Sequence, residues 1–248
     1  MNKWRFLPIQ SNNAYMNMAI DEAISDSVRE GSSYPTIRFY TWDPSAVSIG
    51  CFQSMKDEVD TERCNELGID FVRRKTGGGA VYHDSNGEIT YSIIGKQELF
   101  PTGIIDSYKY ICQFIISGLL KVGITAEFSP INDIVVEGKK ISGNAQTRKD
   151  GVLLQHGTIL YDLNIRRMFD VLKVSKEKIS DKAIKNVEER VTMVRKYSDI
   201  SLADLYITLL AGFSEKMDCE EGTLSKKELK KATEAAPNYR SASWNFSR

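Results

Sequence analysis

Three consecutive glycines, Gly77 to Gly79, lie between two segments that have the pattern of β-strands. Glycine tolerates positive φ angles and lets the backbone approach a ligand closely, but ordering it on folding costs more entropy than ordering other residues. Arg73 and Arg74 precede the run, and cations beside exposed backbone N–H groups favour an anion. The segment therefore predicts a strand–loop–strand unit that holds a phosphate-bearing compound. A plain tight turn between strands is the alternative.

The remaining periodicity predicts one α+β domain over residues 1–248, with a strand-rich core and a helical part from residue 164 onward. Apolar residues at helical spacing predict helices over 12–30, 57–67, 104–122, 201–217 and 225–235. Strands are predicted over 36–40, 46–49, 69–74, 80–84, 88–94, 133–136, 140–147 and 152–161. Hairpin turns are predicted at Ser85-Asn86-Gly87, Glu137-Gly138 and Asp150-Gly151.

The composition excludes several classes of protein. The 33 basic and 33 acidic residues balance, so no overall field attracts nucleic acid or an anionic membrane. No apolar run approaches the roughly 18 residues that span a bilayer, and the first ten residues lack the apolar core of a secretion signal. The two histidines are too few for a zinc site built from three. Four scattered cysteines without CxxC spacing indicate a reducing cytoplasm.

The polar residues around the glycine run can be sorted by strand parity. Successive side chains of a strand point to opposite faces, so only one of Arg73 and Arg74 faces a given site. By the same rule, His83 and Tyr82 lie on opposite faces. His83 could hydrogen-bond a ligand phosphate or serve the core, and Asp84 suits the turn that follows it.

A second polar group of residues lies further along the chain. Asn132 and Asp133 precede a predicted strand, where an amide beside a carboxylate suits a polar ligand or Mg²⁺. Lys140 is a compact cation suited to a phosphate or to developing negative charge, and Gly143 and Ala145 leave room beside it. The alternatives are a turn before a strand and solvated hairpin lysines.

Gln155, His156 and Gly157 interrupt an otherwise apolar strand. Buried polar groups need partners, so these residues either line the site or form an internal hydrogen-bond network. For His156 the network is the preferred interpretation.

Taken in order, these segments resemble the signature motifs of the lipoate–protein ligase A family. The matching segments are residues 17–23 (NMAIDEA), 73–84 (RRKTGGGAVYHD), 132–133 (ND), 138–143 (GKKISG) and 155–158 (QHGT). The resemblance implies a fold related to biotin ligases, a mixed sheet flanked by helices. It also implies two half-reactions: lipoate and MgATP form lipoyl-AMP, and a lysine of a lipoyl domain then takes the lipoyl group and releases AMP.

The resemblance also assigns roles to residues of this chain. Lys140 becomes the essential lysine, in contact with the carboxylate and phosphate of the adenylate. Arg73 or Arg74 becomes the phosphate-side arginine, with Arg73 preferred, and Asp133 becomes the candidate Mg²⁺ ligand. The expected substrate- and adenylate-binding residues are Arg73, Arg74, Gly77, Gly78, Gly79, Tyr82, His83, Asn132, Asp133, Gly143 and Ala145.

The C-terminal segment and the partners follow from the same resemblance. Trp244-Asn245 is similar to an aromatic element near the end of the family's large domain, after which many members continue into a small accessory domain. We expect no such domain here, and therefore a catalytic large subunit that works with a separate small accessory subunit. The expected acceptors are lipoyl domains of 2-oxoacid dehydrogenase complexes or the H protein of glycine cleavage.

Three other functions stay open. Octanoyl or lipoyl transferases of the same fold use a cysteine nucleophile, which in one branch lies just before the position of Asn132, and residues 127–133 contain no cysteine. Cys51 is the one cysteine expected near a pocket, whereas Cys112 lies in an apolar helix and is expected to be buried and inert. Biotin ligases have a different glycine motif. A non-catalytic scaffold that only binds an adenylate is the third alternative. It would not need a lysine, two arginines and a histidine together, so the presence of Lys140, Arg73, Arg74 and His83 argues against it.

Overall fold

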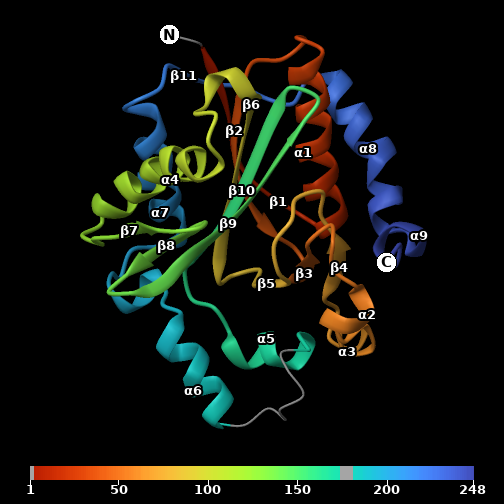
Figure 1. The fold of residues 1–248 in the computed structure, drawn as a ribbon, viewed down its shortest axis with the longest axis vertical. Coiled ribbons are helices and arrows are strands. Elements are labelled where there is room, and N and C mark those ends of the chain that lie inside the picture. Colours follow the sequence, from red (N-terminus) through yellow and green to blue (C-terminus); the bar gives the residue numbers. More distant parts are fainter. Residues whose placement is uncertain (1–2, 174–180) are drawn as a thin grey trace.

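Within residues 3–173 and 181–248, which the computed structural model describes, an eight-stranded mixed sheet forms the centre of the molecule (Figure 1). The strand order is β11 (Cys219–Glu221), β1 (Trp4–Asn12), β2 (Thr36–Trp42), β6 (Glu88–Lys96), β10 (Val152–Leu160), β9 (Lys139–Lys149), β8 (Asp133–Val136) and β7 (Glu127–Ser129). β1 runs parallel to both β11 and β2, and the other neighbours are antiparallel. The expected mixed sheet is therefore confirmed.

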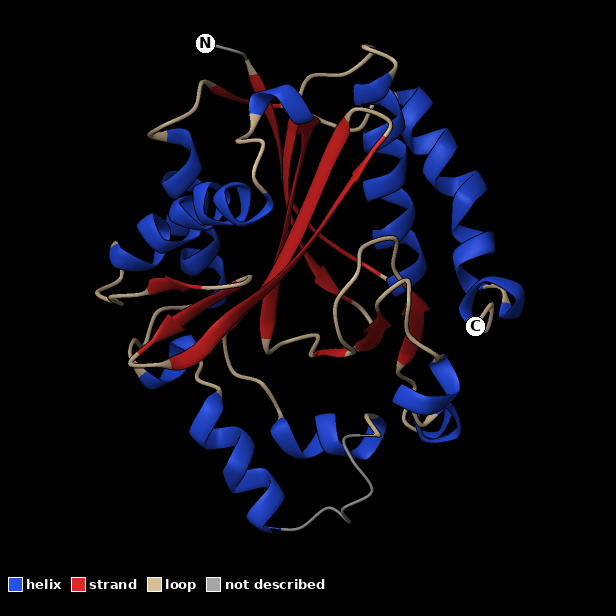
Figure 2. Cartoon of the chain, viewed as in Figure 1, coloured by secondary structure: helices blue, strands red, loops and turns tan. Residues whose placement is uncertain are grey.

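Helices cover both faces of this sheet (Figure 2). α1 (Ala14–Arg29) and α8 (Lys226–Arg240) pack on one face, and α4 (Ile104–Leu120) and α7 (Leu202–Ser214) pack on the other. Because both faces are covered, β6 is buried along its first eight residues. Asn13 caps α1, since its side chain accepts the N–H of Met16 at 2.9 Å.

A second, three-stranded sheet carries the glycine loop. Its order is β4 (Asp70–Arg73), β3 (Ala46–Ile49) and β5 (Val81–His83), and the loop connects the two outer strands. The remaining α-helices are α2 (Met55–Glu58), α3 (Thr61–Glu66), α5 (Ile165–Val171), α6 (Asp181–Arg190) and α9 (Ala242–Asn245). In Figure 1, α9 lies beside β4, although the two are far apart in the sequence.

The predicted hairpin between residues 80–84 and 88–94 is wrong. β5 pairs with β3 in the small sheet, whereas β6 pairs on its two edges with β2 and β10 in the large sheet. With both edges of β6 occupied, no edge is left for β5, and the turn 85–87 leads from one sheet to the other. Asp84 serves this turn, since its Oδ1 accepts the N–H of Asn86 at 3.1 Å.

The predicted helix over 57–67 is divided into α2 and α3. Val59 is extended, with φ of −128°, and Asp60 begins α3 by accepting the N–H of Arg63 at 2.9 Å. The sequence analysis also missed β1, whose burial does not alternate because its register shifts between Leu7 and Gln10. Residues 174–180, part of the region predicted to be mostly helical, lie outside the described residues.

The two Gly-containing turns of the large sheet are confirmed. Glu137 and Gly138 have φ of 51° and 73°, and Asp150 and Gly151 have φ of 51° and 78°. Two successive residues at positive φ give the type I′ geometry that matches the twist of paired strands. These turns set the pairing of β8, β9 and β10, which supply one wall of the site.

Candidate functional site

A cavity of about 390 Å³, here called the main cavity, opens between the glycine loop and strands β9 and β10. Most of its wall is apolar, with Trp42, Leu160 and Met168 among the lining side chains, and a few polar groups converge on it. Such a lining suits a small molecule with an aliphatic body and a polar end. Nine predicted site residues line the cavity: Arg74, Gly78, Gly79, Tyr82, His83, Asn132, Lys140, Gly143 and Ala145. Arg73, Gly77 and Asp133 do not.

Arg74 brings a buried positive charge to this cavity. Its guanidinium donates to the carbonyls of Gly77 and Gly79 at 2.7 and 2.8 Å, and to Ser48 and Thr76. No carboxylate pairs with it among the described residues. Burial lowers the pKa of Arg74 to about 10, so the side chain remains charged at neutral pH. Arg74 therefore shapes the glycine loop and leaves an uncompensated charge that favours an anion.

Gly78 has to be glycine for this arrangement to form. Its φ is +93°, and a Cβ on it would lie 2.9 Å from Nη2 of Arg74. The contact between the glycine loop and Arg74 therefore depends on the glycine at position 78, and the anion site expected there stays a prediction.

Arg73 points away from the main cavity, so the preference for Arg73 over Arg74 is wrong. Its Nη1 donates to the carbonyls of Cys51 and Gln53 at 3.1 and 2.6 Å, and its Nε and Nη2 donate to the carbonyls of Trp244 and Asn245. The physical reason is the strand parity of β4, which sends neighbouring side chains to opposite faces.

Lys140 lies on the wall of the cavity because of a β-bulge. Val135 pairs with Lys140 and Ile134 pairs with Ser142, which leaves Ile141 as the extra residue. The Nζ of Lys140 lies 2.8 Å from Oδ1 of Asp133. A Cβ on Gly143 would lie 2.6 Å from Cε of Lys140, so the glycine provides the space across which the lysine side chain extends.

Asn144 is a cavity residue that the sequence analysis did not single out. Tyr91 donates its hydroxyl to Oδ1 of Asn144 at 2.7 Å, and Nδ2 of Asn144 donates to the carbonyl of Asn132 at 2.9 Å. The side-chain amide of Asn132 in turn donates a hydrogen bond to the carbonyl of Asn144. A Cβ on Gly157 would lie 1.9 Å from Oδ1 of Asn144, so Asn144 needs a glycine opposite it. A glycine inside a strand indicates that another group approaches closely, and Gly157 is therefore the sequence signal that could have pointed to a residue such as Asn144.

Both ring nitrogens of His83 are engaged by protein groups. Nδ1 lies 2.7 Å from Oε1 of Glu88, and Nε2 lies 2.8 Å from Oγ of Ser48. The imidazole also stacks on Trp42, with the ring centroids 3.9 Å apart. His83 therefore lines the cavity with its ring, and the expected hydrogen bond from His83 to a phosphate would require one of these bonds to exchange.

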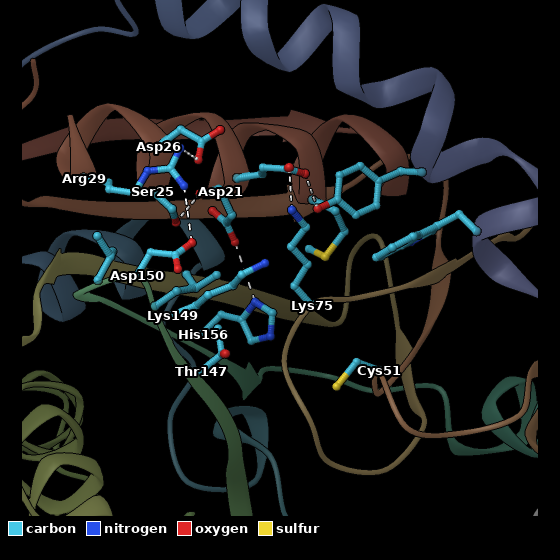
Figure 3. A pocket seen from close by; sticks show the side chains of 16 residues that line it. Asp21, Ser25, Asp26, Arg29, Cys51, Lys75, Thr147, Lys149, Asp150 and His156 are labelled. Carbon is cyan, nitrogen blue, oxygen red and sulfur yellow. Dashed lines mark hydrogen bonds and ion pairs between the residues drawn. The ribbon is translucent and has the colours of Figure 1, made fainter. Parts of the chain in front are cut away.

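A second cavity of about 480 Å³, here called the outer cavity, is lined by the side chains drawn in Figure 3. Met18 and His156 line both cavities, so the two meet there. His156 Nε2 lies 2.7 Å from Oγ1 of Thr76, and Nδ1 lies 3.6 Å from Oδ2 of Asp21. Burial lowers the pKa of His156 below its ordinary value. His156 thus belongs to an internal network, as preferred, and also to the cavity wall.

The four cysteines lie outside the main cavity. Cys51 lines the outer cavity, where Figure 3 shows it on the side of Lys75. Cys64 and Cys112 are fully buried, as expected for Cys112, and burial raises the pKa of each thiol to about 12, which disfavours the reactive thiolate. Within residues 3–173 and 181–248, no three His, Cys, Asp or Glu side chains gather as they would around a metal ion.

Residues 13–214 match the model of a family described as the lipoyl protein ligase A/B catalytic domain. This chain belongs to that family. It is 35% identical over 272 residues to octanoyltransferase LipM of Staphylococcus epidermidis, with 98% of each chain covered. It is also 35% identical over 273 residues to octanoyltransferase LipM of Clostridioides difficile, with 100% of each chain covered.

Two solved structures are similar over almost their whole length. A bipartite lipoate protein ligase from Thermoplasma acidophilum, described together with its E2 lipoyl domain, has a TM-score of 0.89 and 33% identity and covers 99% of this chain and 97% of its own. A lipoate-protein ligase A bound with ATP has a TM-score of 0.84 and 31% identity, with 99% of both chains covered.

These findings confirm the expected family and the α+β fold. The protein is an enzyme of the lipoate ligase and acyltransferase family, in which the similar ligases and the similar octanoyltransferases are both full-length matches. Among the described residues, no helix has the length and hydropathy needed to span a membrane.

Proposed function

We propose that this chain transfers a short acyl group, lipoyl or octanoyl, from an acyl adenylate to a lysine of a lipoyl domain. One observation carries the proposal: the main cavity combines an uncompensated buried Arg74 with the amine of Lys140, and no cysteine lines it. Two cations beside an apolar cavity suit an acid joined to a phosphate. A thioester route needs a thiol there instead.

The charges on the cavity wall account for both half-reactions. A carboxylate and a triphosphate repel one another, so bringing them together requires fixed positive charge. Near a protein surface, a unit charge 4 Å from an opposite one gains about 4 kcal/mol. Arg74 is held in place by its five contacts, whereas Lys140, whose side chain is 42% exposed, is held by its ion pair with Asp133.

The apolar part of the cavity performs a separate task. Trp42, Leu160 and Met168 would surround the aliphatic chain and exclude water from the mixed anhydride. The acceptor amine then attacks the acyl carbon, the bond from that carbon to the phosphate oxygen breaks, and AMP leaves. Positioning the amine is the main requirement of this step, because the carbon is already activated.

ATP and Mg²⁺ are the cofactors that this route requires in its first half-reaction. Asp133 is the carboxylate beside Lys140 that would hold Mg²⁺, which usually binds through one or two carboxylates and the phosphates of its substrate. Support for the nucleotide comes from the similar ligase that is bound with ATP.

The partners are proposed from the same similarities. The Thermoplasma acidophilum ligase is described with an E2 lipoyl domain, which supports lipoyl domains of 2-oxoacid dehydrogenase complexes as acceptors. That ligase is bipartite, and 97% of its chain is covered here, which supports a separate small accessory subunit for the adenylation step.

Octanoyl transfer from a carrier thioester without ATP is the second candidate. Four curated relatives at 35% identity are named octanoyltransferase LipM, and their names support this route more strongly than ATP-dependent ligation. The side chains of the main cavity favour the adenylate instead. If the thioester route operates, Cys51 is the candidate thiol, because it lines the outer cavity and its backbone N–H donates to the carbonyl of Thr76, beside the glycine loop, at 2.9 Å.

Intact-mass analysis of an apo lipoyl domain separates these donors. Parallel reactions contain lipoyl-AMP, lipoate with MgATP, or an octanoyl carrier-protein thioester without ATP. We expect modification from lipoyl-AMP in the wild type and in Cys51→Ser, and its loss in Lys140→Met. Modification only from the thioester, abolished in Cys51→Ser, would replace the proposal by the second candidate. Modification from lipoate and MgATP without any partner would refute the need for an accessory subunit.

A further inference from the structure

The C-terminal residues Trp244 and Asn245 are hydrogen-bonded to the strand that enters the glycine loop. Trp244 donates its Nε1–H to the carbonyl of Arg73 at 2.8 Å, and Oδ1 of Asn245 accepts the N–H of Arg73 at 2.7 Å. The side chains of the C-terminal segment thus satisfy both backbone groups of Arg73, about 170 residues away in the sequence.

The side chain of Arg73 completes this connection. Its Nε and Nη2 donate to the carbonyls of Trp244 and Asn245 at 3.1 and 2.9 Å, while Nη1 donates to the carbonyls of Cys51 and Gln53. Arg73 is 2% exposed, and all these partners are neutral carbonyls. A buried cation held only by carbonyls of two other segments fixes those segments relative to each other, because leaving its donors unpaired would be costly.

A second connection reaches the loop at Lys75. Lys75 forms an ion pair with Glu22 on α1, and Tyr239 of α8 donates its hydroxyl to the other oxygen of Glu22 at 2.7 Å. Tyr239 is in turn tied to the C-terminal segment, since its carbonyl accepts from Nδ2 of Asn245 at 2.8 Å and its ring meets Trp244 edge-on at 5.6 Å. Figure 3 shows Lys75 extending towards α1.

Arg73 and Lys75 flank Arg74, and both are held from the C-terminal side. Arg74 lies between these two held residues, and its guanidinium lies against the glycine loop and the main cavity. We propose that Tyr239, Trp244 and Asn245 form a brace that positions Arg74 and the glycine loop for the anionic end of the substrate. These three are positioning residues, since none of them lines the main cavity.

The effect of the brace on catalysis depends on the proposed function. Its effect on the glycine loop does not, and can be measured without substrate. Trp244→Phe removes the donor to Arg73 and keeps an aromatic ring against Tyr239. Loss of one hydrogen bond of this kind changes a local opening equilibrium by about 2- to 10-fold. The matched control is Trp4→Phe, a buried tryptophan of β1 that packs against Phe100.

The test is hydrogen exchange followed by mass spectrometry of peptides covering residues 75–82, with the full chain and no ligand. We expect exchange to be about 2- to 10-fold faster in Trp244→Phe and Asn245→Ala, and unchanged in Trp4→Phe. The KM for lipoyl-AMP should rise in the first two variants by a similar factor while kcat changes less. Wild-type exchange in both brace variants would overturn the inference, and so would equal acceleration in Trp4→Phe.

The two proposals fail in different ways. A wild-type chain that modifies no acceptor from lipoyl-AMP would remove the proposed function, while the exchange comparison would still decide whether the brace holds the loop. Faster exchange with an unchanged KM would show that the loop is held but that its order does not position the anion, which also overturns the inference. If Asn245→Ala fails to fold, Tyr239→Phe, which removes only the bond to Glu22, takes its place.

Discussion

Replacing Lys140 by methionine is expected to remove catalysis and leave the fold almost unchanged. The lysine side chain is 42% exposed, and among the described residues it forms one ion pair, at 2.8 Å, with Asp133, whose side chain is 32% exposed. Partly exposed pairs contribute about 0–1 kcal/mol, so we expect Lys140→Met to lower the free energy of unfolding by less than about 1 kcal/mol. In the variant the buried Oδ1 of Asp133 loses its ion pair, while the rest of this partly exposed carboxylate keeps its contact with solvent.

The expected effect on the rate is much larger. Removing one preorganised group that stabilises developing negative charge costs roughly 10²- to 10³-fold in kcat, or about 2.7–4 kcal/mol. Because Lys140 is partly exposed, solvent screens its charge, and we place the loss at about 10²-fold, the lower end of that range. Arg74, which is buried and remains in the variant, accounts for the residual rate.

The assay is single-turnover transfer from presynthesised lipoyl-AMP to an apo lipoyl domain, with urea unfolding of the same preparations. Lys139→Met is the matched control, since Lys139 is the neighbouring residue of β9 and does not line the main cavity. A loss in Lys140→Met of less than about tenfold, or under 1.4 kcal/mol, would refute the assignment of Lys140. An equal loss in the control would refute it as well.

Three further changes test the geometry of the site. Gly157→Ala would place a Cβ 1.9 Å from Oδ1 of Asn144, and urea unfolding should show a loss of about 1–3 kcal/mol from overpacking. Gly143→Ala would place a Cβ 2.6 Å from Cε of Lys140, a flexible end, so the transfer rate should fall by about tenfold, the equivalent of roughly 1.4 kcal/mol, with little loss of stability. Burial lowers the pKa of His156 below 6.5, so below that pH the unfolded state binds a proton that the folded state does not. The free energy of unfolding should therefore decrease as the pH falls from 7.5 to 5.5, and it should decrease less in His156→Gln; equal pH dependence would contradict this.

Local features of the sequence were sufficient for many elements of the fold. The turns at Glu137-Gly138 and Asp150-Gly151 were predictable because a two-residue turn at positive φ depends on those residues alone. Helix α1 was predictable from its apolar spacing. The hairpin after His83 was not, because its absence depends on both edges of β6 being occupied by strands distant in the sequence.

The site shows the same division between local and distant information. Strand parity predicts that Arg73 and Arg74 diverge, but not which one enters the cavity, since that depends on the contacts of Arg73 with Trp244 and Asn245. The place of Asn144 depends on the register that sets it opposite Gly157, which no local pattern encodes.

The central claim is that the acyl group reaches the acceptor directly from an adenylate bound beside Arg74 and Lys140. Rapid-quench mass spectrometry of one turnover, which records the masses of both this chain and the apo lipoyl domain, tests it most directly. The account predicts that with lipoyl-AMP the acceptor gains one lipoyl group while this chain never gains mass, in the wild type and in Cys51→Ser alike. An acyl group that appears first on this chain and is absent in Cys51→Ser would contradict the account and establish a thioester route.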